Sequence, residues 1–167
     1  MSNIIGITGW KDVGKTHYAS LIIKSLVNKG YLVGSIKHAH HDFDIDKPGT
    51  DSFKHREAGS NQVIISSSKR WAKITENNNE NEKSLDDLIK ELHNVDIVIV
   101  EGFKKDNHPK IEILSKNIKN RNKETKNVIA IVSDDLKEYF PNSKNYLIKQ
   151  LPNKTYIQKK SAIMWLF

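Results

Sequence analysis

The chain has 167 residues, of which 37% are hydrophobic and 28% charged, and its formal net charge at pH 7 is +7. This length and balance fit one globular domain with a substantial core, and the absence of cysteine excludes disulfides and thiolate metal sites. A membrane protein is not expected, because no apolar run approaches the roughly 18–20 residues that cross a bilayer.

The start of the chain and its charge bear on location and partners. The first residues, MSNIIGITGWK, lack the basic segment, the long apolar segment and the cleavage site of a signal peptide, which favours the cytoplasm. The positive charge indicates either a lysine-rich surface or attraction to anionic partners such as nucleotides. Nucleic acid is not an expected partner, because the most basic stretch, residues 115–126, has no aromatic residues for base stacking.

The chain opens with a predicted β-α-β unit. Residues 3–8 are almost continuously apolar, as in a strand buried on both faces of a parallel sheet. Residues 16–30 have the spacing of an amphipathic helix that ends at Gly30, and residues 31–38 form a second strand. The apolar stripe predicted for the helix comprises Ala19, Ile22, Ile23, Leu26 and Val27.

Short elements alternate along the remainder of the chain. They are a helix at 50–59 capped by Thr50 or Asp51, two strands at 61–76 joined by a turn near 68–70, an exposed loop at 76–83, a helix at 84–94 capped by Ser84, strands at 96–103, 109–114 and 127–134, a helix at 135–140, a strand at 146–151 and an amphipathic tail helix. This order predicts an α/β fold with a doubly wound, mostly parallel sheet, helices on both faces and a possible added β-hairpin.

A phosphate-binding pattern lies between the first strand and the first helix. Residues 9–16, GWKDVGKT, satisfy G-x-x-x-x-G-K-[ST] in the strand-to-helix context that its mechanism requires. Lys15 would reach the β- and γ-phosphates, and Thr16 would place its hydroxyl on Mg²⁺. The fold is therefore expected to be the three-layer P-loop NTPase fold. The loop residues assigned to nucleotide binding are Gly9, Trp10, Lys11, Asp12, Val13, Gly14, Lys15, Thr16 and His17.

The strand at 96–103 offers two acidic residues for a metal site. Asp96 and Glu101 lie five residues apart, or roughly 16 Å along a strand. Because ligands bind at the carboxyl ends of parallel strands, we expect Glu101 to approach the phosphates through a Mg²⁺-bound water. Asp96 would lie at the opposite edge and cap the strand entry. Gly102 would leave room beside the γ-phosphate.

Histidines and aspartates are concentrated after the second strand. The sequence KHAHHDFDIDKPG, residues 37–49, admits a transition-metal site, an inert loop, or a segment that binds a substrate or acts as a switch, and we favour the last. Lys37 and His38 are assigned to phosphate or an anionic cofactor. The cationic residues of the next helix would either extend this surface or be solvated. The remaining candidates are His40, His41, Asp42, Asp44, Asp46, Lys54, His55 and Arg56.

Four sequence segments together resemble the MobB family of molybdopterin-guanine dinucleotide biosynthesis accessory proteins. They are GITGWKDVGKT, KHAHHDFDIDKPGTDSFKHREAGS, SSSKRWA, and VIVEGFK followed by PKIE, and the resemblance covers roughly residues 1–135. The second segment is more specific than the phosphate loop, which unrelated NTPases share. Residues 141–167 follow the family only loosely. The resemblance is consistent with a single P-loop nucleotide-binding domain over residues 1–167.

The resemblance implies a cytoplasmic protein that binds GTP with Mg²⁺ and hydrolyses it slowly, with Lys15 and Glu101 in the catalytic role. It implies an accessory to a MobA-type guanylyltransferase that attaches GMP to molybdopterin, and a homodimer. Asp134, at the end of a strand, is placed either to read guanine or to cap a helix. The NKxD-like sequence at 122–125 precedes its strand and is interpreted as a chance match.

Two other functions remain open from the sequence. A small-molecule kinase using ATP or GTP would hold its substrate with Lys37, His38 and the aspartates, and the fold alone does not separate it from an accessory protein. The lack of arginine and glutamine in residues 6–20 favours low turnover. A nucleic-acid-binding protein is the more distant alternative, and steep salt dependence would identify it.

Overall fold

The computed structural model describes residues 3–39, 42–77, 82–114, 124–133, 146–151 and 154–159. The chain divides into two compact units: unit 1 comprises Met1–His38 and Leu85–Phe167, and unit 2 comprises Ala39–Ser84. The single functional domain expected from the sequence stays a prediction.

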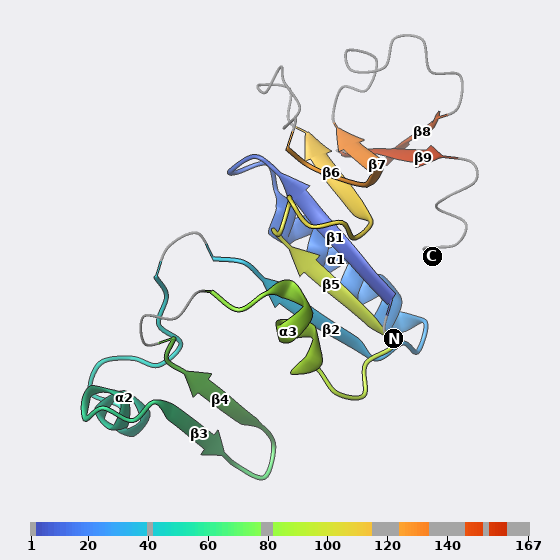
Figure 1. The fold of residues 1–167 in the computed structure, drawn as a ribbon. Coiled ribbons are helices and arrows are strands. Elements are labelled where there is room, and N and C mark those ends of the chain that lie inside the picture. Colours follow the sequence, from blue (N-terminus) through green and yellow to red (C-terminus); the bar gives the residue numbers. More distant parts are fainter. Residues whose placement is uncertain are drawn as a thin grey trace. The chain divides into compact units, whose positions relative to one another are not determined.

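Unit 1 is built on a five-stranded parallel sheet in the order β2-β5-β1-β6-β7. Figure 1 shows β1 at its centre, between β5 and β6. The strand bounds are β1 Asn3–Gly9, β2 Val33–Lys37, β5 Ile97–Glu101, β6 Lys110–Leu114 and β7 Val128–Ser133. The central strands are buried along most of their length because both faces of the sheet are covered.

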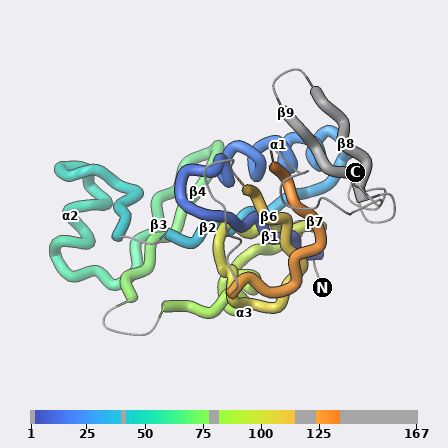
Figure 2. Tube along the Cα trace, turned by 90° about the horizontal axis from the view of Figure 1, so that it is seen from above, coloured from blue at the N-terminus to red at the C-terminus, as the bar shows by residue number. Residues whose placement is uncertain are grey.

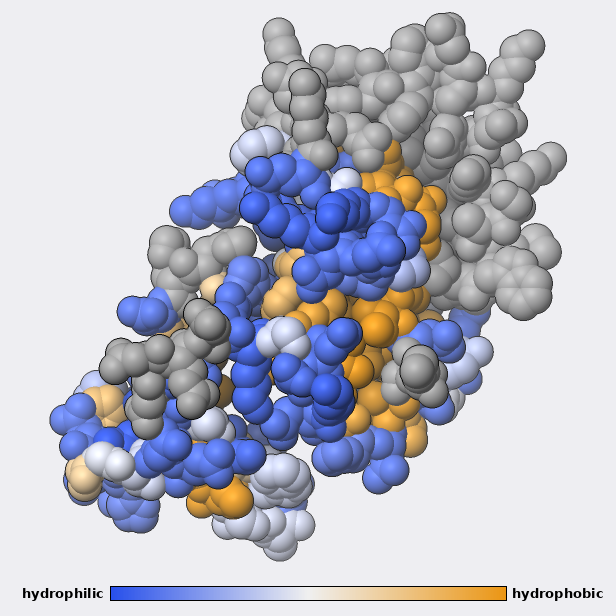
Figure 3. All heavy atoms as spheres, viewed as in Figure 1, coloured by the Kyte–Doolittle hydropathy of each residue, from blue (hydrophilic) through white to orange (hydrophobic). Residues whose placement is uncertain are grey.

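Helices α1 (Lys15–Asn28) and α3 (Leu85–Lys90) cover opposite faces of this sheet, as Figure 2 shows. Ala19, Ile22 and Leu26 of α1 pack on one face, and Leu85 of α3 packs with Val98 on the other. In the face drawn in Figure 3, hydrophobic residues gather over the sheet and hydrophilic residues lie around them. The expected three-layer α/β fold with helices on both faces is therefore confirmed.

The apolar stripe of α1 is narrower than expected. Val27 is 53% exposed, so its assignment to the buried face was wrong. The buried positions 19, 22 and 26 follow the three- and four-residue spacing of one helix face, whereas Val27 is turned about 100° away from Leu26.

Near the end of unit 1, β8 (Tyr146–Leu151) pairs with β9 (Lys154–Lys159) in antiparallel orientation. The expected strand at 146–151 is confirmed, but the tail helix was wrong over 154–159. Thr155, Tyr156 and Ile157 are types that favour strands, and this local preference outweighs the amphipathic helical spacing. The helix expected at 135–140 and the last part of the tail, 160–167, lie outside the described residues.

Unit 2 contains α2 (Asp51–Glu57) and a hairpin of β3 (Gln62–Ser66) and β4 (Trp71–Thr75). Thr50 is the N-cap residue of α2, and the hairpin turn is closed by a hydrogen bond from the Ser67 amide to the Arg70 carbonyl. Helix, cap position and hairpin all agree with the sequence. Among the described residues, no helix has the length and apolar character needed to cross a membrane.

Candidate functional site

The loop from β1 to α1 has the backbone of a phosphate cradle. Gly9 has φ +149°, and a Cβ there would lie 2.5 Å from the Ile113 carbonyl oxygen, so β6 closes against the loop. Gly14 has φ +87° and is the N-cap residue of α1, and it makes no side-chain cap hydrogen bond. The first N–H groups of a 14-residue helix thus begin at the loop, where they favour an anion.

Lys15 lies across this loop. Its Nζ donates to the Trp10 carbonyl oxygen at 2.6 Å, which folds the side chain back over residues 10–14. Partial burial lowers the pKa of Lys15, while the charges of Glu101 and Asp12 oppose this shift. A polyphosphate in the loop would replace one carbonyl oxygen with charged acceptors, for which an ammonium is better suited.

Thr16 and Glu101 are in direct contact at the carboxyl edge of the sheet. The Thr16 hydroxyl donates toward the two Glu101 carboxylate oxygens, at 2.9 and 3.0 Å. Strand register explains the meeting, because Glu101 ends β5 opposite Ile7 of the neighbouring β1, just before the loop. Mg²⁺ is commonly held by one or two protein oxygens together with substrate phosphates, so these two groups fit that ion.

Lys37 ends β2 directly opposite Glu101 in the parallel register. Its Nζ lies 3.7 Å from Glu101 Oε1 and 3.4 Å from Thr16 Oγ1. The Lys37 side chain is 62% exposed, whereas that of Glu101 is 12% exposed. Lys37, one of the two residues assigned from the second strand, therefore lies beside Thr16 and Glu101 at the phosphate loop.

His38 is held against the end of β5. Its backbone N–H donates to the Glu101 carbonyl at 2.9 Å, and its ring packs on Phe103 with centroids 4.8 Å apart. Gly102 has φ +107°, and a Cβ there would lie 2.6 Å from the His38 Cβ. The missing side chain of Gly102 thus makes room for His38, and room for a γ-phosphate stays a prediction.

Other loop residues have separate surroundings. Val13 packs against the hydrophobic core, so only its backbone is available to a phosphate. Asp12 has φ +62°, and the His17 ring stands edge-on to Tyr18 at 5.5 Å. Lys11 lies in the exposed part of the loop.

Asp96 lies at the opposite edge of the sheet, as the sequence predicts. Its Oδ2 accepts a hydrogen bond from the Leu32 N–H at 2.8 Å, and its backbone N–H donates to the Leu32 carbonyl at 2.7 Å. It therefore fastens the entries of β2 and β5 and takes no part in the phosphate site.

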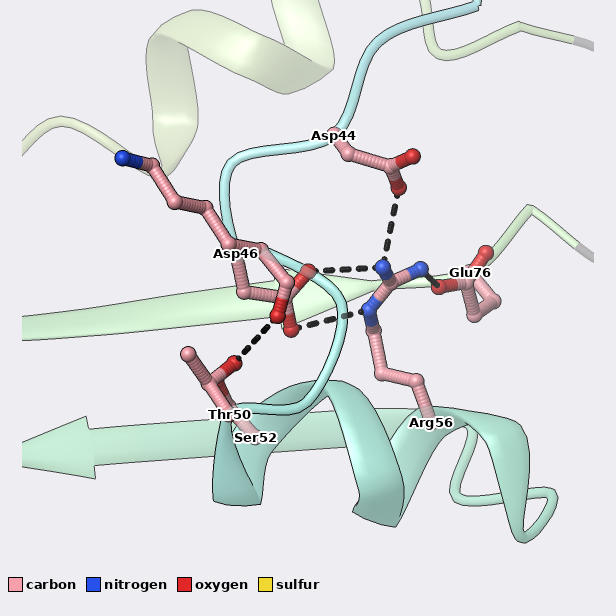
Figure 4. Close-up of polar contacts among 7 residues, drawn as sticks. Asp44, Asp46, Thr50, Ser52, Arg56 and Glu76 are labelled. Carbon is pink, nitrogen blue, oxygen red and sulfur yellow. Dashed lines mark hydrogen bonds and ion pairs between the residues drawn. The ribbon is translucent and has the colours of Figure 1, made fainter.

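In unit 2, Arg56 binds three carboxylates, as Figure 4 shows. Its guanidinium donates to Asp44 at 2.9 Å, to Asp46 at 2.6 and 3.2 Å, and to Glu76 at 2.7 Å. The hydrogen bond from Arg56 lowers the pKa of Asp46, and the carboxylates raise the pKa of Arg56. Arg56 is therefore engaged by Asp44, Asp46 and Glu76 of its own unit, and its part in an anion-binding surface stays a prediction.

The other candidates of residues 37–56 are less closely engaged. Lys54 pairs with Asp51 at 3.4 Å on the surface of α2. Among the described residues, no three His, Asp or Glu side chains gather to hold a metal ion. His40 and His41 lie outside the described residues, as do Asp134 and residues 122 and 123 of the NKxD-like sequence.

Sequence reasoning missed a buried polar cluster at the entry of β6. Lys110 is fully buried, and its Nζ donates to the carbonyls of Asp106, His108 and Lys126. His108 is 8% exposed and packs on Gly6, and neither ring nitrogen has a hydrogen-bond partner among the described residues. Burial lowers the pKa of His108 to about 4. The signal was the polar residues in PKIEIL, which a strand assignment alone does not explain.

Comparisons with known proteins identify a family that this sequence matches. The sequence model of MobB, described as molybdopterin guanine dinucleotide synthesis protein B, matches residues 4–134. The molybdopterin-guanine dinucleotide biosynthesis adapter protein of Escherichia coli is 37% identical over 139 residues, which are 80% of this chain and 79% of that protein. The protein of the same name from Haemophilus influenzae is 42% identical over 110 residues, which are 65% of this chain and 61% of that protein.

Solved structures show the same fold. Bacillus subtilis MobB superposes with a TM-score of 0.65 at 20% identity, covering 96% of this chain and 91% of that one. A MobB homologue from Bacillus stearothermophilus gives a TM-score of 0.61 at 20% identity, covering 80% and 79%.

Proposed function

The chain belongs to the MobB family, and from this premise we propose that it is a GTP-binding adapter in the biosynthesis of the molybdopterin-guanine dinucleotide cofactor. The curated relatives carry the name of biosynthesis adapter proteins in that pathway. The adapter role and the nucleotide site are complementary, because GTP contains the GMP group that becomes part of the dinucleotide.

One observation carries the nucleotide assignment: the contact between Thr16 and Glu101 beside a glycine loop that opens onto a helix N-terminus. The loop supplies N–H groups, Lys15 supplies a charge, and the hydroxyl and carboxylate supply oxygen ligands. Mg²⁺ at Thr16 and Glu101 would neutralise charge on the phosphates. Thr16 and Glu101 would hold the ion, while Lys15 would bind and orient the phosphates.

Slow turnover is part of the proposal. Charge-stabilising groups such as an arginine finger increase phosphoryl-transfer rates by roughly 10³–10⁵. Residues 6–20 contain neither arginine nor glutamine, and Arg56 is already bound to carboxylates in unit 2. Hydrolysis would therefore be slow unless a partner supplies such a group.

Three further parts of the proposal concern partners and location. We propose a MobA-type guanylyltransferase and molybdopterin as partners, a homodimer as the assembly and the cytoplasm as the location. The cysteine-free sequence and the adapter relatives support these assignments. Asp134 is retained as a candidate for reading guanine.

Equilibrium binding of GTP, GDP, ATP and molybdopterin to the purified protein, with and without Mg²⁺, tests the function. We expect tighter binding of GTP than of ATP and a slow basal release of phosphate. Equal affinity for both nucleotides, with ATP consumed only when a small-molecule acceptor is added, would instead identify a kinase. Failure to bind any nucleotide would contradict the phosphate-loop assignment.

A further inference from the structure

Three strand or helix ends place one cation next to the proposed metal ligands. Thr16 is the second residue of α1, Glu101 ends β5, and Lys37 ends β2. The Lys37 ammonium lies 3.4 Å from the Thr16 hydroxyl and 3.7 Å from the Glu101 carboxylate. It is thus near the two oxygen groups that fit Mg²⁺.

Hydrogen-bond geometry makes this contact specific. A threonine hydroxyl has one proton and two lone pairs, and the Thr16 proton is directed to Glu101. The remaining lone pairs are therefore the acceptors that face Lys37. A metal ion needs those same lone pairs, because a ligating hydroxyl can donate its proton elsewhere but must offer an oxygen lone pair to the ion.

We propose that the Lys37 ammonium stands in for the divalent cation in the metal-free protein, and that binding of a Mg²⁺-nucleotide displaces it into solvent. This inference rests on the proposed function, since it concerns the same phosphate site. Lys37 is then a positioning residue that sets how strongly nucleotide binding depends on Mg²⁺.

Two features distinguish Lys37 from the loop lysine. Lys15 is held by the Trp10 carbonyl at 2.6 Å and lies within the loop, whereas the Lys37 ammonium contacts the Thr16 and Glu101 side chains among the described residues. With its side chain 62% exposed, Lys37 also has solvent to move into when a doubly charged ion repels it. The β2–β5 register and the His38–Glu101 backbone hydrogen bond keep its Cα beside Glu101 throughout.

The charge balance gives the direction of the effect. Without metal, Lys37 offsets the Glu101 carboxylate, which would otherwise repel the phosphates. With metal, the ion takes over this task and competes with Lys37 for the Thr16 hydroxyl. Removing the ammonium should therefore weaken nucleotide binding in EDTA and leave it unchanged or stronger in Mg²⁺.

The test measures the dissociation constant of GDP by calorimetry in saturating Mg²⁺ and in EDTA, for the wild-type full chain and for Lys37→Met. We expect the ratio of the EDTA value to the Mg²⁺ value to rise about tenfold in the variant, which corresponds to the loss of one close charge interaction. Lys24→Met, which removes a charge from an exposed position of α1, is the matched control and should leave the ratio unchanged. Lys37→Arg should stay close to wild type, because it keeps the charge.

Titration of the nucleotide-free proteins with Mn²⁺ gives a second readout. Lys37→Met should bind Mn²⁺ more tightly than wild type and Lys24→Met. If all variants share one EDTA-to-Mg²⁺ ratio and one Mn²⁺ affinity while still binding GDP, the role of Lys37 is refuted and the nucleotide site stands. If the wild type binds no nucleotide in either condition, the proposed function is refuted, and this inference with it.

Discussion

The Thr16 hydroxyl donates to the carboxylate of Glu101, 85 residues further along the chain, at 2.9 Å. The contact does not arise within one element, because Thr16 lies in the first turn of α1 and Glu101 ends β5. The parallel pairing of β1 with β5 brings them together. The contact can therefore form only when β1 and β5 are paired in this register.

Lys15→Ala should weaken GTP binding on the order of 10- to 100-fold, because hydrogen bonds to charged groups contribute roughly 1.5–3 kcal/mol. Its contact in the described structure is with a loop carbonyl, so the fold should persist. Calorimetry measures the affinity and circular dichroism the fold. Unchanged affinity in a folded variant would rule out Lys15 as a phosphate ligand, and Lys24→Ala serves as the control.

Glu101→Gln should reduce Mg²⁺-dependent GTP hydrolysis about 10- to 100-fold, the range found when groups that support a metal are altered. Nucleotide binding should change much less, because the amide still offers an oxygen to Thr16. Phosphate release and GDP affinity are measured in parallel. Equal losses in both would mean that Glu101 supports the loop instead of the metal.

Gly102→Ala should destabilise the protein by about 2–4 kcal/mol, since it combines a left-handed backbone with a steric clash. The clash is with the His38 Cβ, 2.6 Å from the added methyl. Gly30→Ala separates the two causes, because Gly30 has φ +88° and nothing within 4 Å of an added Cβ. Thermal unfolding should show a clearly larger loss for Gly102→Ala, and equal losses would exclude the contact with His38 as the cause.

Arg56→Met should lower the melting temperature, because it leaves Asp46, whose side chain is 4% exposed, among other carboxylates. The hydrogen bond from Arg56 lowers the pKa of Asp46. The contribution of this hydrogen bond to the free energy of unfolding is therefore complete above the ordinary pKa of aspartate, and it is lost as the pH falls through the lowered pKa of Asp46.

Thermal melts from neutral to acidic pH measure this effect, and the curves of wild type and Arg56→Met should converge at low pH. Arg56→Lys should recover only part of the loss, since one ammonium cannot replace a guanidinium that bonds three carboxylates. Full recovery by lysine would show that charge alone matters.

His108 should make unfolding depend on pH between about 6.5 and 4. Burial lowers the pKa of His108 from 6.5 to about 4, so in this range the unfolded chain binds the proton and the folded protein does not. The contribution of His108 to the free energy of unfolding is complete above pH 6.5 and decreases as the pH falls toward 4. Denaturant unfolding at several pH values should show a shallower fall for His108→Phe than for wild type, with His93→Gln as an exposed control. Parallel curves for all three proteins would contradict this role.

Much of the site could be predicted from the sequence because its signals are local. The glycine pattern of residues 9–16 predicts the conformation of the loop. The direction of the apolar strand predicts that Glu101, and not Asp96, lies at the edge of the sheet beside this loop. The position of Lys37 follows from the same rule, since β2 and β5 end at one edge of the sheet.

The parts that were missed depend on tertiary contacts. The alternating aspartates before α2 do not reveal that Asp44 and Asp46 converge on Arg56, because this requires the loop to fold back. Lys110 was not expected to be buried, since its partners are backbone carbonyls that carry no sequence signal. Val27 was misplaced because helical spacing gives the direction of a face but not its width.

The place of β1 at the centre of the sheet affects when the site can form during synthesis. The phosphate loop is complete by Thr16, but the two strands that flank β1 begin at Ile97 and Lys110. A ribosome therefore releases the loop long before its neighbours exist, and parallel pairing over such a separation is slow. Nascent chains that end before β6 should be unable to bind a nucleotide, so the ligand can stabilise only a nearly complete polypeptide.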